Sequence, residues 1–180
     1  MAHMQSEGEG VKLLARSWQQ SGDRLEDRLA GLTDAEYLWL PTDDGWTIHP
    51  DPMRPGRWTY DYDFAPPAPA PITSIAWRLV HIIADNEIYW EYAFGPGQRT
   101  FPDLIVPETA SAALDAWHHS RAPITEWLAD ATADDLAESR PSHLGDPTPA
   151  GEVVRILVDE QTHHGAEIAL LRDLYLRIAR

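Results

Sequence analysis

Four long segments of this chain repeat apolar residues every three or four positions, and this period restricts the fold more than any other feature. The segments run from Val11 to Leu32, from Thr73 or Ser74 to Phe94, from Glu108 to Ala131, and from the region of Pro149–Gly151 to the C-terminus. Such spacing is typical of amphipathic α-helices, each of which buries one apolar stripe. No run with the period of a β-strand accompanies them. The sequence therefore predicts an all-α protein, built as a four-helix bundle.

Two short Thr-capped turns follow the first and third predicted helices. Thr33-Asp34-Ala35-Glu36 has the Ser/Thr-x-x-Glu form of a capping box, in which the two side chains bond backbone N–H groups of the turn. Thr132 to Leu136 repeats this design, so the chain reads as an internal duplication of a long helix and a small turn. Pro123 lies inside the third helix and predicts a kink there.

A segment from Pro41 to Pro71 connects the first two predicted helices and holds eight of the fifteen prolines. It also contains five aromatic residues, namely Trp46, Trp58, Tyr60, Tyr62 and Phe64. These rings favour a long structured loop over a disordered one, and a loop of this length could cross the end of the bundle and make two helices parallel. We expect it to cover one end of the bundle, with some of its rings lining a metal pocket. The alternative is that the rings plug the end of the bundle far from the ion.

Length and charge restrict the class of protein. The 180 residues, 43% of them hydrophobic, suffice for one well-buried domain, which we place at residues 1–180. A net charge of −15 disfavours nucleic acid and anionic bilayers as partners, and the sequence has neither a membrane-length apolar run nor a secretory signal. We therefore expect a cytoplasmic protein, in which Met1–His3 are an expression remnant before a native start at Met4.

Cysteine is absent from the sequence. This excludes disulfides, iron–sulfur clusters, thiolate-bound zinc and a cysteine nucleophile. Any sulfur chemistry would therefore need a thiol supplied by a cosubstrate.

Three polar side chains fall on the apolar stripes of two different helices. Glu160 and His164 lie on the stripe of the fourth predicted helix, and His81 lies on that of the second. Buried carboxylates and imidazoles must be paired, hydrogen-bonded or bound to a metal. If the two stripes face each other, the three groups can converge, and their N and O atoms suit a divalent zinc, nickel, iron or manganese ion with open coordination positions. A hydrogen-bonded pair without a metal is the alternative.

Other titratable residues give weaker signals. Asp159 and His163 form a competing pair four residues apart, about 100° around the helix from the first pair, so we interpret His163 as a group beside the site or in the wall of its pocket. Glu87 follows His81 and could reach the core as a carboxylate beside the ligands. His118–His119 is interpreted as a solvated or helix-packing pair. No residue beyond the ligands can be given a catalytic role.

Two motifs resemble those of the DinB-like (damage-inducible) superfamily of four-helix metal-binding proteins. The run Glu160-Gln161-Thr162-His163-His164-Gly165-Ala166-Glu167-Ile168 resembles its last-helix signature, His-x-x-His-His-Arg-Gly-Gln-Ile, and Trp77-Arg78-Leu79-Val80-His81 resembles its second-helix motif. The resemblance implies metal ligands at His81, Glu160 and His164. Glu160 stands where most members have histidine, although the related mycothiol-dependent maleylpyruvate isomerases have glutamate there. Gly165 and Ala166 stand where the signature has arginine and glycine.

The resemblance also implies a class of function. Our first hypothesis is a metal-dependent transferase that uses a low-molecular-weight thiol such as mycothiol; a metal-dependent hydrolase and a non-catalytic metal- or ligand-binding bundle are the alternatives. Zinc or nickel is the favoured ion, with iron or manganese left open. Expected partners are a small-molecule substrate and, in the first hypothesis, a small thiol, with no nucleic acid and no membrane. The resemblance alone suggests a homodimer.

Overall fold

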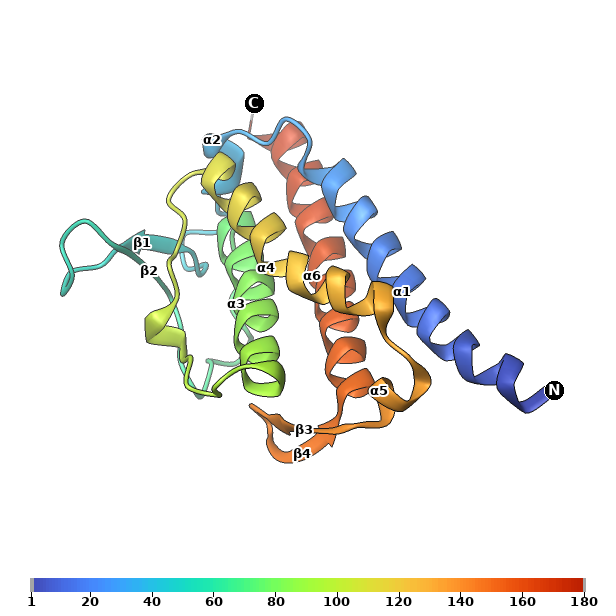
Figure 1. Cartoon of the computed structure of the whole chain (residues 1–180). Helices are drawn as coiled ribbons and strands as arrows, with labels where there is room; N and C mark the ends of the chain where they lie inside the picture. Colours follow the sequence, from blue (N-terminus) through green and yellow to red (C-terminus); the bar gives the residue numbers. More distant parts are fainter. Residues whose placement is uncertain (1, 180) are drawn as a thin grey trace.

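The protein is mainly helical, as the sequence predicts, and its computed structural model describes residues 2–179 (Figure 1). Its four long helices are α1 (Ala2–Leu29), α3 (Ile75–Phe94), α4 (Ala110–Asp130) and α6 (Ala150–Ile178). Helix α6 packs against both α1 and α3, and α4 packs against α3 and α1. The side chains of α6 therefore meet those of α3 in the interior.

We expect Met1–His3 to be an expression remnant. Met1 and the side chains of the other two residues lie outside the part of the chain that the structure describes. Within residues 2–179, no helix is both long and apolar enough to span a membrane.

Local capping fixes both ends of α3 and the start of α4. Ser74 precedes α3, and its side chain accepts a hydrogen bond from the backbone N–H of Trp77, which confirms the predicted start. The same helix ends at Gly95, as the sequence predicts. Helix α4 begins after Thr109, whose hydroxyl accepts from the backbone N–H of Ala112. Each start satisfies a backbone donor that helix geometry leaves free.

Short helices follow α1 and α4, as the repeated Thr-capped motif predicts. They are α2 (Asp34–Tyr37) and α5 (Ala133–Ala137). Both have a complete capping box, made by Thr33 with Glu36 and by Thr132 with Asp135. The two boxes differ in burial: Glu36 is 4% exposed and pairs with Arg172 of α6, whereas Asp135 is partly exposed on the surface. Only the first box is therefore tied to the core.

The expectation that the chain has no β-strand is wrong. Two antiparallel hairpins are present: β1 (Ile48–Pro50) pairs with β2 (Trp58–Tyr60), and β3 (Ser139–Ser142) pairs with β4 (Gly145–Pro149). Strands of three to five residues are too short to show the alternation of a half-buried strand, and prolines interrupt three of these four. The sequence therefore carried no periodic signal for them.

The first hairpin lies within the segment 41–71, and the aromatic residues of that segment have different environments. Trp58 and Tyr60, both in β2, pack against the buried core. Trp46 lies beside Trp77 of α3, with 6.0 Å between the ring centroids. Phe64 is 92% exposed. The segment is thus a structured connection that packs through some of its rings only.

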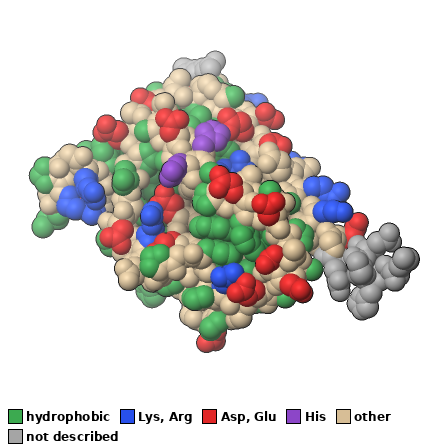
Figure 2. All heavy atoms as spheres, viewed as in Figure 1, with side chains coloured by type: hydrophobic (Ala, Val, Ile, Leu, Met, Phe, Trp, Pro, Cys, Tyr) green, Lys and Arg blue, Asp and Glu red, His purple; other side chains and the backbone are tan. Residues whose placement is uncertain are grey.

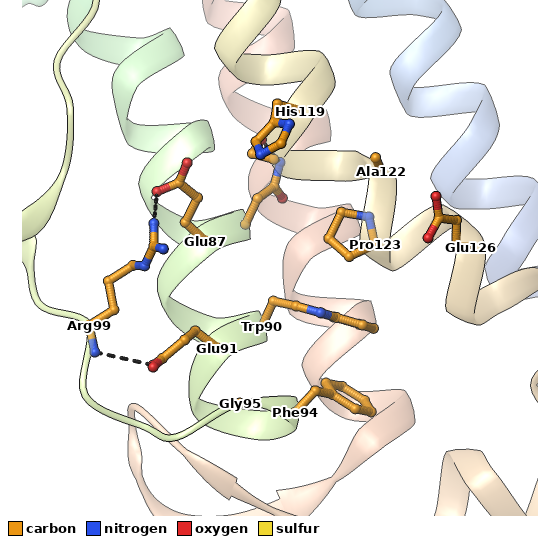
Figure 3. A pocket seen from close by; sticks show the side chains of 12 residues that line it. Glu87, Trp90, Glu91, Phe94, Gly95, Arg99, His119, Ala122, Pro123 and Glu126 are labelled. Atoms are coloured by element: carbon orange, nitrogen blue, oxygen red, sulfur yellow. Dashed lines mark hydrogen bonds and ion pairs between the residues drawn. The ribbon is translucent and has the colours of Figure 1, made fainter.

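Helix α4 changes direction midway along its length (Figure 1). Pro123 lies inside this helix and carries no N–H to donate to the carbonyl of His119. The bend occurs at this residue (Figure 3) and opens space beside α3.

The Glu36→Ala substitution should lower the free energy of unfolding by about 3 kcal/mol, because it leaves the guanidinium of Arg172 without its carboxylate in a largely buried position. Urea unfolding followed by circular dichroism measures the change. Asp135→Ala, which breaks the surface capping box, is the matched control and should cause a clearly smaller loss. Equal losses would show that Glu36 acts only as a cap.

Candidate metal centre

The structure brings the three predicted ligand residues together, from α3 and α6. His164 Nε2 lies 3.2 Å from Glu160 Oε2, and His81 Nε2 lies 3.6 Å from the same oxygen. One ligand atom from each residue fits in a group whose members are all within 4.8 Å of one another. The side chain of His164 is 6% exposed, while those of Glu160 and His81 are 26% and 31% exposed. The group is therefore buried on the His164 side and accessible on the other.

The second ring nitrogen of His164 is held by a carboxylate. Its Nδ1 lies 2.6 Å from Glu167 Oε2, and Arg78 Nε lies 3.0 Å from the same oxygen. Arg78 Nη1 also approaches Nδ1, at 3.3 Å, but the shorter contact indicates that Nδ1 carries a proton and donates a hydrogen bond to the carboxylate of Glu167. A histidine that donates from Nδ1 presents an Nε2 lone pair to a metal. The contact therefore favours the tautomer that can ligate.

His81 is positioned by aromatic packing. Its ring stacks on Trp77, with centroids 5.3 Å apart and planes 10° apart, and meets the ring of His164 edge-on at 4.7 Å. Trp77 in turn donates from Nε1 to the carbonyl of Asp61 at 2.7 Å and lies beside Trp46. The segment 41–71 thus reaches the centre through the residue that supports His81.

Asp85 is a buried carboxylate that lies next to these three residues. The sequence alone did not predict its place there. Asp85 is 3% exposed, its Oδ2 lies 3.3 Å from His81 Nε2, and this oxygen forms no hydrogen bond with any residue that the structure describes. Burial and, to a smaller extent, the charge of Glu160 raise the pKa of Asp85 to about 6, against the opposing effect of the two imidazoles. The available signal was an aspartate one turn after His81, directly after three apolar residues of α3.

Charge coupling perturbs the other groups in opposite directions. In the absence of a metal, hydrogen bonds from Nε2 of His164 and of His81 hold the pKa of Glu160 far below its ordinary value, although burial opposes this. Burial by itself lowers the pKa of His81, but the hydrogen bond to Glu160 and the charges of Asp85 and Glu160 outweigh it, so the pKa is raised. Glu160 is thus held ionised in the form that can bind a cation.

The geometry and chemistry of the group fit a divalent ion. Two donors that each lie about 2.1 Å from one tetrahedral ion are about 3.4 Å apart, and the observed separations of 3.2 and 3.6 Å bracket this value. Imidazole nitrogen and carboxylate oxygen are ligands of zinc, nickel, iron and manganese. The buried oxygen of Asp85, which lacks a hydrogen bond, also favours a positive charge nearby. The group could therefore hold a metal.

The competing residues lie at the edge of this centre. Asp159 is exposed. His163 is also exposed; its ring centroid lies 3.7 Å from that of His164 and its Nδ1 lies 3.9 Å from Glu160 Oε2. His163, His164 and Glu167 form a second group of suitable atoms, but Glu167 is already paired with Arg78. The group of His81, Glu160 and His164 is therefore the better candidate for a metal site.

Glu87 does not reach the core near His81, contrary to the sequence-based expectation. Its carboxylate pairs with the guanidinium of Arg99, from the loop that follows α3 (Figure 3). Helical geometry explains the difference, because residues six apart on an α-helix point in directions about 120° from each other, away from the α6 face.

Comparison with known proteins agrees with the fold and the motifs. The DinB superfamily profile matches residues 56–168, so the chain belongs to the DinB superfamily. The chain is 23% identical to protein YrdA of Bacillus subtilis (strain 168) over 156 residues, which cover 87% of this chain and 77% of YrdA. A crystal structure of a conserved protein from Enterococcus faecalis superposes with a TM-score of 0.55 at 14% identity, covering 94% of this chain and 97% of the other. That similarity shows a shared fold.

Asp85→Asn should stabilise the metal-free protein in a pH-dependent way. The folded-state pKa of Asp85, about 6, lies above its ordinary value of 3.8, so ionising this residue destabilises the fold; the penalty is absent below about pH 4 and complete above about pH 6. We expect the chelated variant to gain on the order of 3 kcal/mol in unfolding free energy at pH 7.5 and little at pH 4. Urea unfolding at both pH values measures this. No gain at pH 7.5 would contradict the assignment, and Asp159→Asn is the exposed control.

Proposed function

We propose that this protein binds one divalent metal ion through His81, Glu160 and His164 and that the ion is the centre of its chemistry. The observation that carries the proposal is the convergence of these three side chains, from two helices, with ligand atoms all within 4.8 Å of one another. The hydrogen bond between His164 and Glu167 supports it, because metal-ligating histidines commonly donate their second N–H to a carboxylate. Zinc or nickel suits the donors, and iron or manganese would also be accepted.

A bound divalent ion with an open position supplies one chemical service, which is to lower the pKa of a coordinated water or thiol. The residues of this chain position the ligands. Glu167 and Arg78 hold the ring of His164 in place, while Trp77 supports the ring of His81. The partly exposed sides of Glu160 and His81 leave room for a small molecule to approach.

A transferase that uses a low-molecular-weight thiol is our first candidate activity. The chain has no cysteine, so a thiol must come from a cosubstrate. Membership of the DinB superfamily supports this activity together with Glu160, which stands where the related mycothiol-dependent isomerases have glutamate. The acceptor would be a small molecule, and a homodimer is the assembly that this relationship suggests.

A hydrolase is the second candidate, in which Asp85 would act on water. A buried carboxylate that lacks a hydrogen bond, close to His81, could accept a proton from a water molecule at the centre. A thiol would release its proton to the same group, so Asp85 serves either activity. The nature of the incoming ligand is what separates them.

Protein purified without a histidine tag should contain about one divalent ion per chain. Removing one imidazole should reduce the metal content at least tenfold, because each variant loses one of three ligands. Elemental analysis of His81→Ala and His164→Ala measures this, with Asp159→Asn as the control that should keep its metal. Unchanged metal content in His81→Ala would exclude the centre, whereas loss only in Asp159→Asn and His163→Ala would favour the competing register.

Cobalt substitution can separate the two candidate activities. If a thiol binds at the centre, adding mycothiol or 2-mercaptoethanol to the cobalt protein should produce a thiolate-to-cobalt charge-transfer band that saturates with concentration. The matching alcohol, ethylene glycol, should produce none. His164→Ala loaded with cobalt is the control for free metal. A cobalt spectrum that responds to pH but not to thiol would instead support the hydrolase.

A further inference from the structure

Apart from the candidate metal centre, a pocket lies between α3 and α4, on the side of α3 that carries Glu87 (Figure 3). Its volume is about 520 Å³, within the range of small-molecule sites. None of the three candidate metal ligands lines it. Figure 2 shows hydrophobic side chains on this face, below the bend of α4, with acidic side chains around them. The pocket is therefore a separate candidate for binding.

The bend of α4 lies beside this space. Pro123 lines the pocket together with His119 and Ala122 (Figure 3). Because proline has no N–H, the carbonyl of His119 loses the donor it would have in a regular helix. The bend thus leaves the main-chain carbonyl of a pocket-lining residue without its regular helical donor.

The charged groups of the pocket are mostly acidic. Glu87, Glu91 and Glu126 line it, against the single guanidinium of Arg99. Arg99 pairs with Glu87, and Glu91 accepts hydrogen bonds from the backbone N–H groups of Gln98 and Arg99. Glu126 is exposed and has no ion pair with any residue that the structure describes. The pocket therefore keeps an excess of negative charge after its internal pairing.

A buried amide provides a further acceptor on the α3 side. Asn86 is 1% exposed and lines the pocket. Its Nδ2 donates to Ser120 Oγ at 3.1 Å, and Ser120 donates onward to the carbonyl of Trp117 at 2.9 Å. These bonds use one of the two N–H groups of Asn86 and the hydroxyl hydrogen of Ser120, and among residues 2–179 no donor bonds Asn86 Oδ1. A ligand that donates hydrogen bonds would satisfy this oxygen.

Aromatic rings form the apolar part of the pocket. Trp90 and Phe94 line it and stack with their centroids 4.0 Å apart, and Trp127 meets the ring of Trp90 edge-on at 6.0 Å. Indole faces attract organic cations, through the ring quadrupole and through burial of the cation's hydrocarbon body. Acceptors, carboxylates and an indole together select a ligand with N–H donors and a positive charge.

We propose that this pocket binds a small organic ammonium ion, in which a primary amine is attached to a flat or aliphatic body. The ammonium group faces Glu126 and the acceptors of Asn86 and His119, and the body lies against Trp90. Anionic and neutral molecules of the same shape are rejected, because neither can offer the acceptors a charged donor. The site is independent of the proposed metal centre.

Isothermal titration with phenethylammonium tests the proposal. One saturable site per chain is expected, with 2-phenylethanol and 3-phenylpropionate binding at least tenfold more weakly. Glu126→Lys and Trp90→Leu should each weaken phenethylammonium about tenfold. Asp115→Lys makes the same charge change at an exposed position of α4 and is the matched control; it should leave the affinity within twofold.

His164→Ala serves as the control for the metal centre, because amines can ligate metals. It should bind phenethylammonium as the parent does, so failure of the metal proposal would not affect this result. The proposal is overturned if 2-phenylethanol binds as well as the amine. It is also overturned if Glu126→Lys, which alters only an exposed side chain and folds as the parent does by circular dichroism, has no more effect than Asp115→Lys.

Discussion

The enclosure of several charged groups between α3 and α6 is the constraint on which the rest of the structure depends. Glu160, Glu167 and Asp85 surround two imidazoles, with Arg78 as the nearby cation. Removing such groups from water is unfavourable unless each finds a partner. Most of them form hydrogen bonds within the protein, but Asp85 Oδ2 forms none with any residue that the structure describes, and a divalent ion among these groups would supply positive charge beside it.

The surrounding elements hold α3 and α6 in the register that this arrangement needs. Ser74 fixes the start of α3, and Trp77, one turn later, joins the segment 41–71 to the ring of His81. At the opposite side, Arg172 of α6 pairs with Glu36, which belongs to the capping box of α2. Helix α2 and the segment 41–71, which together connect α1 to α3, are therefore each joined to one of the two helices that carry the candidate ligands.

The bend of α4 gives the molecule a second polar region with a different chemistry. At the candidate metal centre, two imidazoles and a carboxylate share one point, which suits a compact cation with strong ligand preferences. Between α3 and α4, the carboxylates are spread around a pocket lined by Trp90 and Phe94, which suits a larger and softer cation. The two proposed sites thus lie on different faces of α3.

The sequence by itself predicted the long helices, the cap of α3, the two Thr-capped turns and the three candidate ligands. These follow from local rules: the 3.6-residue period, the Ser or Thr that precedes a helix, and polar residues at stripe positions such as His81 and His164. The short hairpins carry no period and were missed. Only the tertiary structure decided that Asp85 lies beside His81 and that Glu87 turns toward Arg99, because the rotation and register of packed helices set which polar groups meet.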